Sequence, residues 1–175
     1  MTNGIPLELV LAPRRSSWLH RLWRYGPIAL WIALIFWAST DQFSSEHTAG
    51  IIQPWIQWLF PAMSPAGVES LHAVIRKSAH VTEYAIFALL VARALMSSSI
   101  RILSRGWLVI SLLMLAAVAV ADEYHQSFVP SRTAAITDVL IDMSGGLVAL
   151  TILALWWLAR RRWSSRFSVL RQPKG

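Results

Sequence analysis

Four long runs of apolar residues restrict the fold of this chain more than any other feature. They lie at residues 23–40, 79–96, 106–121 and 134–159. A helix needs about 20 predominantly apolar residues to cross the roughly 30 Å hydrocarbon layer of a membrane. Hydrophobic residues make up 55% of the 175 residues and charged residues only 14%, which is outside the range of ordinary soluble domains. The sequence therefore predicts an all-α, polytopic membrane protein with a bundle of about four transmembrane helices.

The first run is the shortest of the four, because its uninterrupted apolar core covers only residues 26–38. Tryptophans at the headgroup level would complete this span. A cleaved signal peptide is the alternative, since Arg14 and Arg15 precede the run and residues 38–40 resemble a cleavage site. Three further spans and the lack of a clear Ala-x-Ala site favour an uncleaved first helix.

Basic residues orient the predicted bundle, because short cytoplasmic loops carry an excess of Lys and Arg. Thirteen of the 16 basic residues lie in the N-terminal arm and the start of the first run, around the loop between the second and third runs, or after the last run: Arg14, Arg15, Arg21, Arg24, Arg93, Arg101, Arg105, Arg160, Arg161, Arg162, Arg166, Arg171 and Lys174. The connection from 41 to 70 has none. We expect a protein of the inner (plasma) membrane with both termini in the cytoplasm, and with residues 1–22 and 160–175 as basic cytoplasmic flanks.

The net charge of +7 then reflects contact with anionic lipid headgroups, so nucleic acid is not an expected partner. The chain has no Cys, which excludes disulfides and thiolate chemistry. No repeat or linker divides it, so we expect one domain over residues 1–175. Residues 50–60 are too short to span and rich in Trp, and they predict a short interfacial helix on the outer side, with Pro54 in its first turn. This helix would be an anchor or a lid over a site.

Ionisable residues gather at the outer ends of the predicted spans, where they cost several kcal/mol unless they are paired or hydrated. One group lies on a flank of the second span, one follows the third span, and one lies on a face of the fourth. The members are Arg76, Lys77, His80, Glu83 and Tyr84; Asp122, Glu123, Gln126 and Arg132; Asp138 and Asp142. The topology brings the groups together, so we expect one polar pocket at the extracytoplasmic interface. The alternative is a set of salt bridges that only holds the helices together.

Two of these stretches resemble the VanZ-like integral membrane family: RKSAHVTEYAIFALL and DEYHQSFVPSRTAAITDVLIDMSGG. The family pattern is Lys-x-x-His-x-x-x-Tyr, then Asp-Glu-x-x-Gln-x-Phe-x-Pro-x-Arg, then Asp and Gly in the next helix. The matching positions are Lys77, His80, Tyr84, Asp122, Glu123, Gln126, Phe128, Pro130, Arg132, Asp138 and Gly145. The resemblance covers about residues 75–146. The chain departs from the family at Ser131, where Gly is common, and at Asp142, where Asn is common.

The resemblance implies a role in the cell envelope, because the family is named for a protein that lowers susceptibility to the glycopeptide teicoplanin. It supplies no reaction, and it does not by itself assign antibiotic resistance to this chain. One hypothesis is a binding protein whose cationic and polar side chains hold the anionic headgroup of a membrane lipid or a lipid-linked cell-wall precursor. The residues assigned to this role are Lys77, Tyr84, Gln126, Arg132 and Asp138, together with His80.

The other hypothesis is an enzyme acting on an envelope lipid, with His80 and either Asp122 or Glu123 as general acid and base. His80, Glu83, Asp122 and Asp138 also permit a divalent-metal site, but no compact ligand motif occurs, so we assign no metal and no cofactor. A transporter is a third option, which four spans without inverted repeats do not favour.

Overall fold

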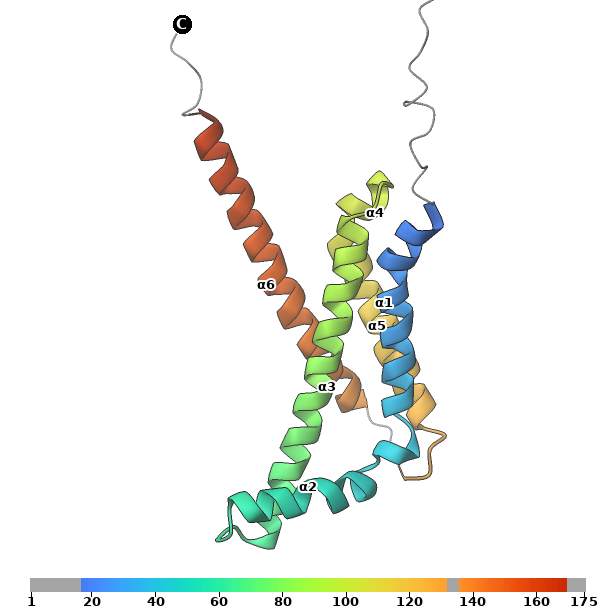
Figure 1. Cartoon of the computed structure of the whole chain (residues 1–175), viewed down its shortest axis with the longest axis vertical. Coiled ribbons are helices and arrows are strands. Elements are labelled where there is room, and N and C mark those ends of the chain that lie inside the picture. Colours follow the sequence, from blue (N-terminus) through green and yellow to red (C-terminus); the bar gives the residue numbers. More distant parts are fainter. Residues whose placement is uncertain (1–16, 132–135, 170–175) are drawn as a thin grey trace, which may run out of the picture.

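The computed structural model describes residues 17–131 and 136–169, with side chains described for 18–131 and 136–163. Every regular element in these ranges is a helix, which confirms the prediction of an all-α fold. In chain order the elements are α1 (Ser17–Ala38), the short 3-10 helix η2 (Asp41–Phe43), α2 (Ser45–Leu59), α3 (Pro65–Met96), α4 (Arg101–Arg105), α5 (Trp107–Gln126) and α6 (Ile136–Val169), as Figure 1 shows.

Three of these helices, α3, α5 and α6, are long and apolar enough to cross a membrane by themselves. The segment that begins with α1 meets the same criterion only together with its continuation through Asp41–Leu59, from which it is bent by 72°. The structure therefore has three to four candidate spans, in agreement with the predicted polytopic bundle. Pro27 lies inside α1, a position that neighbouring helices make tolerable in membrane proteins.

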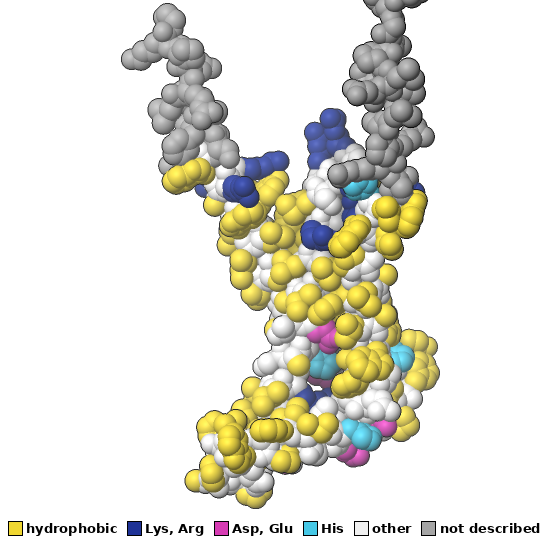
Figure 2. Space-filling view, viewed as in Figure 1, with side chains coloured by type: hydrophobic (Ala, Val, Ile, Leu, Met, Phe, Trp, Pro, Cys, Tyr) yellow, Lys and Arg dark blue, Asp and Glu magenta, His cyan; other side chains and the backbone are white. Residues whose placement is uncertain are grey.

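The two ends of the bundle differ in their polar residues. The start of α1, the end of α6 and the short α4 lie at one end, and α2 lies across the other (Figure 1). Lys and Arg side chains gather at the first of these ends in Figure 2. We call it the basic end and call the opposite one the α2 end.

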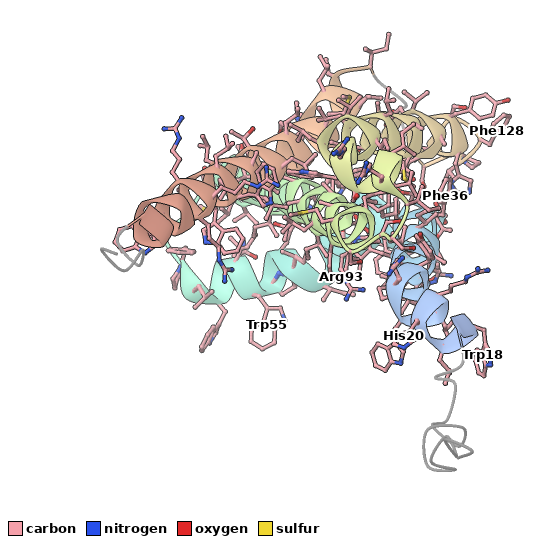
Figure 3. The ribbon with its side chains drawn as sticks, turned by 90° about the horizontal axis from the view of Figure 1, so that it is seen from above. Trp18, His20, Phe36, Trp55, Arg93 and Phe128 are labelled. Atoms are coloured by element: carbon pink, nitrogen blue, oxygen red, sulfur yellow. The ribbon has the colours of Figure 1, made fainter. Side chains whose placement is uncertain are left out.

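The interfacial helix is longer than the sequence suggested. It begins at Ser45, where the Ser44 side chain accepts a hydrogen bond from the His47 N–H at 3.4 Å and so caps the first turn. Pro54 consequently lies inside the helix, and the prediction that it marks the first turn is wrong. The Trp55 side chain is 65% exposed and points away from the bundle (Figure 3), as an interfacial anchor requires.

Two of the spanning helices also extend beyond the predicted runs. Helix α3 starts at Pro65, capped by Ser64, because Pro suits a first helical turn and the Ser64 hydroxyl accepts from the Gly67 N–H at 3.2 Å. Helix α5 continues to Gln126, so the acidic residues that end its apolar run do not end the helix. Asp122, Glu123 and Gln126, which were expected to follow the third span, therefore belong to α5 itself.

Helix α3 is the centre of the bundle and packs against α1, α2, α5 and α6. Its fully buried side chains include Tyr84, Phe87 and Val91. Two glycines let α6 approach closely. A Cβ at Gly145 would lie 2.0 Å from the carbonyl oxygen of Val81, so the backbones of α3 and α6 are in direct contact there. This crossing fixes how the polar residues of the two helices face each other.

Candidate functional site

A polar cavity of about 190 Å³ lies toward the α2 end of the bundle. Side chains from α2, α3, α5, α6 and the loop after α5 line it: Ser45, Ala73, Arg76, Lys77, His80, Glu123, Gln126, Ser131, Asp138, Ile141 and Asp142. Figure 2 shows acidic, basic and histidine side chains together in a recess above α2. The three groups predicted from the sequence thus contribute to one cavity.

The wall formed by α3 is cationic. Arg76 and Lys77 are neighbours in the sequence, and His80 follows within one helical turn. Lys77 is exposed, whereas Arg76 and His80 are half-buried. Tyr84, the last member of the predicted flank, does not line the cavity, because it lies one turn deeper and is fully buried.

Asp122 is the centre of a buried hydrogen-bond network beside the cavity. It is fully buried and accepts from the Tyr84 hydroxyl at 3.1 Å and from the Gln126 amide at 3.0 Å, both at Oδ2. The same Gln126 amide nitrogen lies 3.3 Å from the Ser39 hydroxyl, at the end of α1. The network joins α5 to α3 and α1, and Gln126 carries it to the cavity wall. Asp122 itself does not line the cavity.

The α6 wall supplies two carboxylates, and one of them reaches the cationic wall. Asp142 is buried, and its Oδ1 lies 3.6 Å from Nδ1 of His80. It is located one turn before Gly145, where α6 touches α3, so the helix crossing holds the two side chains at this distance. The sequence placed Asp142 in the polar cluster, and its carboxylate faces the imidazole of His80.

Carboxylates crowd this part of the bundle. Asp142 lies within electrostatic reach of four others, namely Asp122, Glu123, Asp138 and Glu83. Asp138 is also within reach of the Arg76 guanidinium on the opposite wall. Close carboxylates in a poorly hydrated site repel each other unless protons or cations accompany them. The five carboxylates therefore need protons, cations or the neighbouring basic side chains to balance their charge.

Contacts that bring α2 and the α5–α6 loop to the cavity were not predicted from the sequence. The Thr48 hydroxyl of α2 lies 3.1 Å from Nε2 of the buried His72 of α3. The Ser131 hydroxyl donates a hydrogen bond to Asp41 Oδ1. These pairs are 24 and 90 residues apart, so no local spacing signal indicates them. Together they place α2 and the loop against the other helices at this end.

Of the residues predicted to form the site, the structure brings Lys77, His80, Glu123, Gln126 and Asp138 to the cavity. Asp122 and Tyr84 lie behind its wall, and Arg132 is outside the described residues. Arg76 and Asp142, which the sequence placed in the cluster without a role, also line the cavity. Within 17–131 and 136–169, no three His, Asp or Glu side chains are arranged to hold a metal ion.

The apolar helices and the polar cavity at one end define an integral membrane protein with a site inside its helix bundle. The model of the VanZ/LLP1 family matches residues 25–158, which is most of the chain, so the chain belongs to this family. The match confirms the resemblance seen in the motifs and extends it to α1 and α2. No curated protein and no solved structure matches the chain.

Proposed function

We propose that the protein binds the anionic headgroup of an envelope lipid, or of a lipid-linked cell-wall precursor, in this cavity and thereby modulates the cell envelope. The observation that supports the proposal is a cavity lined by Arg76 and Lys77 at the end of a membrane-embedded bundle. Guanidinium and ammonium groups are the side chains that hold phosphate and carboxylate most strongly, Arg by its fork of N–H donors.

The size of the cavity suits a headgroup. A single water needs roughly 10–15 Å³ of such space, and the cavity has about 190 Å³. Helix α2 contributes Ser45 to the lining and exposes Trp55 and Trp58 on its outer surface. Tryptophans prefer the headgroup level of a membrane, so α2 would hold the cavity at the depth where lipid headgroups lie.

We further propose that the α2 end faces the envelope and that the basic end faces the cytoplasm of a cell with this protein in its inner membrane. The distribution of Lys and Arg supports this orientation, because these residues gather at the end where α1 begins and α6 ends (Figure 2). The ligands accessible to the cavity would then be outer-leaflet lipids and precursors on their way to the cell wall.

The pair formed by His80 and Asp142 favours a second candidate, an enzyme acting on an envelope lipid. A carboxylate facing an imidazole is the arrangement that positions a general base. In this case His80 would exchange protons with the substrate and Glu123, on the α5 wall, would serve as the second acid or base. A chemical change in extracted lipids that requires His80 would select the enzyme, whereas a binding protein leaves lipid structures intact.

Lipid retention tests the binding proposal. The purified chain is incubated with phosphatidylglycerol in mild detergent, and native mass spectrometry counts the lipids retained per protein. Arg76→Gln removes the buried part of the cationic wall and Lys77→Gln removes its exposed part, so we expect each to lower retention about tenfold, the effect of one charge-assisted hydrogen bond.

A charge-matched variant at the basic end is the control. Arg101 is exposed on α4, and Arg101→Gln removes the same charge far from the cavity. We expect this variant to retain as much lipid as the unsubstituted chain. Equal retention by all three variants would show that the cavity cations do not hold the lipid, and the proposal would fail.

A further inference from the structure

The two sides of the cavity carry opposite charge. Arg76 and Lys77 project from α3, whereas Asp138 and Asp142 project from α6 and Glu123 from α5. Helices α3 and α6 run in the same direction and cross at Gly145, so the charged residues of both lie on the same side of the crossing (Figure 1). A ligand in the cavity is therefore in reach of cations on one side and of carboxylates on the other.

Carboxylates outnumber the permanent cations of the described lining. Three of them face Arg76 and Lys77 across the cavity, and Asp122 and Glu83 lie close enough to Asp142 to interact with it electrostatically. Even with Arg132 counted from the sequence, the cluster has an excess of acidic groups. A headgroup that is only anionic increases this excess, whereas a headgroup that also has an ammonium group adds no net charge.

The geometry of the carboxylates favours an ammonium group over a metal ion as the source of positive charge. No three acidic or histidine side chains of the described residues converge as metal ligands do. An ammonium group does not need such convergence, because its three N–H donors reach separate acceptors in different directions. Carboxylates on two helices with an amide nearby at Gln126 suit such a donor.

We infer that the ligand of this cavity is a zwitterionic phosphate ester with a primary amine, the phosphate on Arg76 and Lys77 and the ammonium on Asp138 and Asp142. This inference rests on the proposed binding of a phosphate-bearing headgroup and specifies its chemistry. The same chemistry has two sources, a membrane lipid with an aminoalcohol headgroup or the soluble phosphodiester released from it. The apolar surface around the recess suits the lipid, since acyl chains attached to the headgroup would lie along it.

Three lipids with the same acyl chains separate the roles of the two walls in the retention assay. Phosphatidylethanolamine has both the phosphate and the primary amine, phosphatidylcholine has an ammonium without N–H donors, and phosphatidylglycerol has no amine. We expect the unsubstituted chain to retain phosphatidylethanolamine about tenfold better than the other two, because only its amine donates hydrogen bonds to the carboxylates.

Substitutions then test whether the ammonium group binds the α6 wall and the phosphate binds the α3 wall. Asp138→Asn should reduce the preference for phosphatidylethanolamine over phosphatidylglycerol to about twofold or less, and Asp138→Glu should restore it. Lys77→Gln should weaken all three lipids alike. Soluble glycerophosphoethanolamine is the competitor that distinguishes the sources: we expect it to displace the lipid only at concentrations at least about a hundredfold above those of the lipid, since it lacks the acyl chains.

The outcomes of these experiments distinguish failure of the amine-specific inference from failure of the headgroup-binding proposal on which it rests. Equal retention of the three lipids by the unsubstituted chain, with loss on Lys77→Gln, would overturn the amine-specific inference and leave headgroup binding intact. Retention that neither Lys77→Gln nor Arg76→Gln reduces would overturn both. Because the lipid comparison uses the unsubstituted chain, it decides the question even if Asp138→Asn fails to fold. Efficient displacement by the soluble phosphodiester would identify that molecule as the ligand and refute the lipid as its source.

Discussion

A methyl group added at Gly145 tests the helix crossing that supports the cavity. The Cβ of Gly145→Ala would lie 2.0 Å from the carbonyl oxygen of Val81, whereas ordinary contacts lie at 3.4–4 Å, so α6 and α3 would have to separate by about 1 Å or more. Overpacking a buried site costs about 1–3 kcal/mol. We expect the upper end, about 3 kcal/mol, because a backbone carbonyl cannot rotate away as a side chain does.

Two other glycines of the chain provide graded controls for this variant. A Cβ at Gly146 would meet the side chain of Leu115 at 2.4 Å, and flexible atoms yield more easily than backbone. A Cβ at Gly50, inside α2, would have no atom within 4 Å, so Gly50→Ala should be neutral or stabilise the helix by about 0.5–1 kcal/mol.

The assay is thermal unfolding in one detergent. About 3 kcal/mol corresponds to a decrease in Tm of roughly 6–12 °C for a chain of this size. We therefore expect Gly145→Ala to lower Tm most, Gly146→Ala to lower it less and Gly50→Ala not to lower it. A Tm for Gly145→Ala within about 2 °C of that of Gly50→Ala would refute the close backbone contact.

Two further substitutions test the buried network and the interfacial helix. Tyr84→Phe removes the hydrogen bond to Asp122, which should cost about 1–3 kcal/mol and lower Tm by roughly 2–12 °C; an unchanged Tm would show that this bond does not stabilise the fold. Replacing both Trp55 and Trp58 by Ala should leave Tm in detergent unchanged but increase maleimide labelling of a Cys at Gln57 in vesicles, because both rings are exposed on α2. Equal labelling would argue against anchoring by these rings.

The apolar runs, and the polar residues that interrupt or flank them, were sufficient to predict much of this fold. Hydropathy identified the spans, since a helix in lipid must satisfy its backbone internally and present apolar side chains. The spacing of Lys77 and His80 placed them on one flank, and both line the cavity. The family resemblance followed from the same residues and was confirmed by the match over residues 25–158.

Helix ends and long-range contacts were less predictable, for different reasons. The start of α3 has a local signal, Ser64 followed by Pro65, but a reading based on hydropathy begins the helix at its apolar part. At the end of α5, Asp122 remains helical and accepts hydrogen bonds from Tyr84 of α3 and from Gln126 of α5 itself, and the sequence does not indicate the partner on α3. The contact between Thr48 and His72 depends on how α2 folds back over α3, which no sequence spacing encodes.

Single cysteines test directly whether the cavity opens toward the envelope, because the chain has no cysteine of its own. Ser127, at the end of α5 near the cavity, and Ser99, beside α4 at the basic end, are both exposed. Each is replaced by Cys, and intact cells are labelled with a membrane-impermeant maleimide. We predict that Ser127→Cys is labelled in intact cells and Ser99→Cys only after permeabilisation. The reverse pattern would place the cavity on the cytoplasmic side and contradict the binding of envelope lipids.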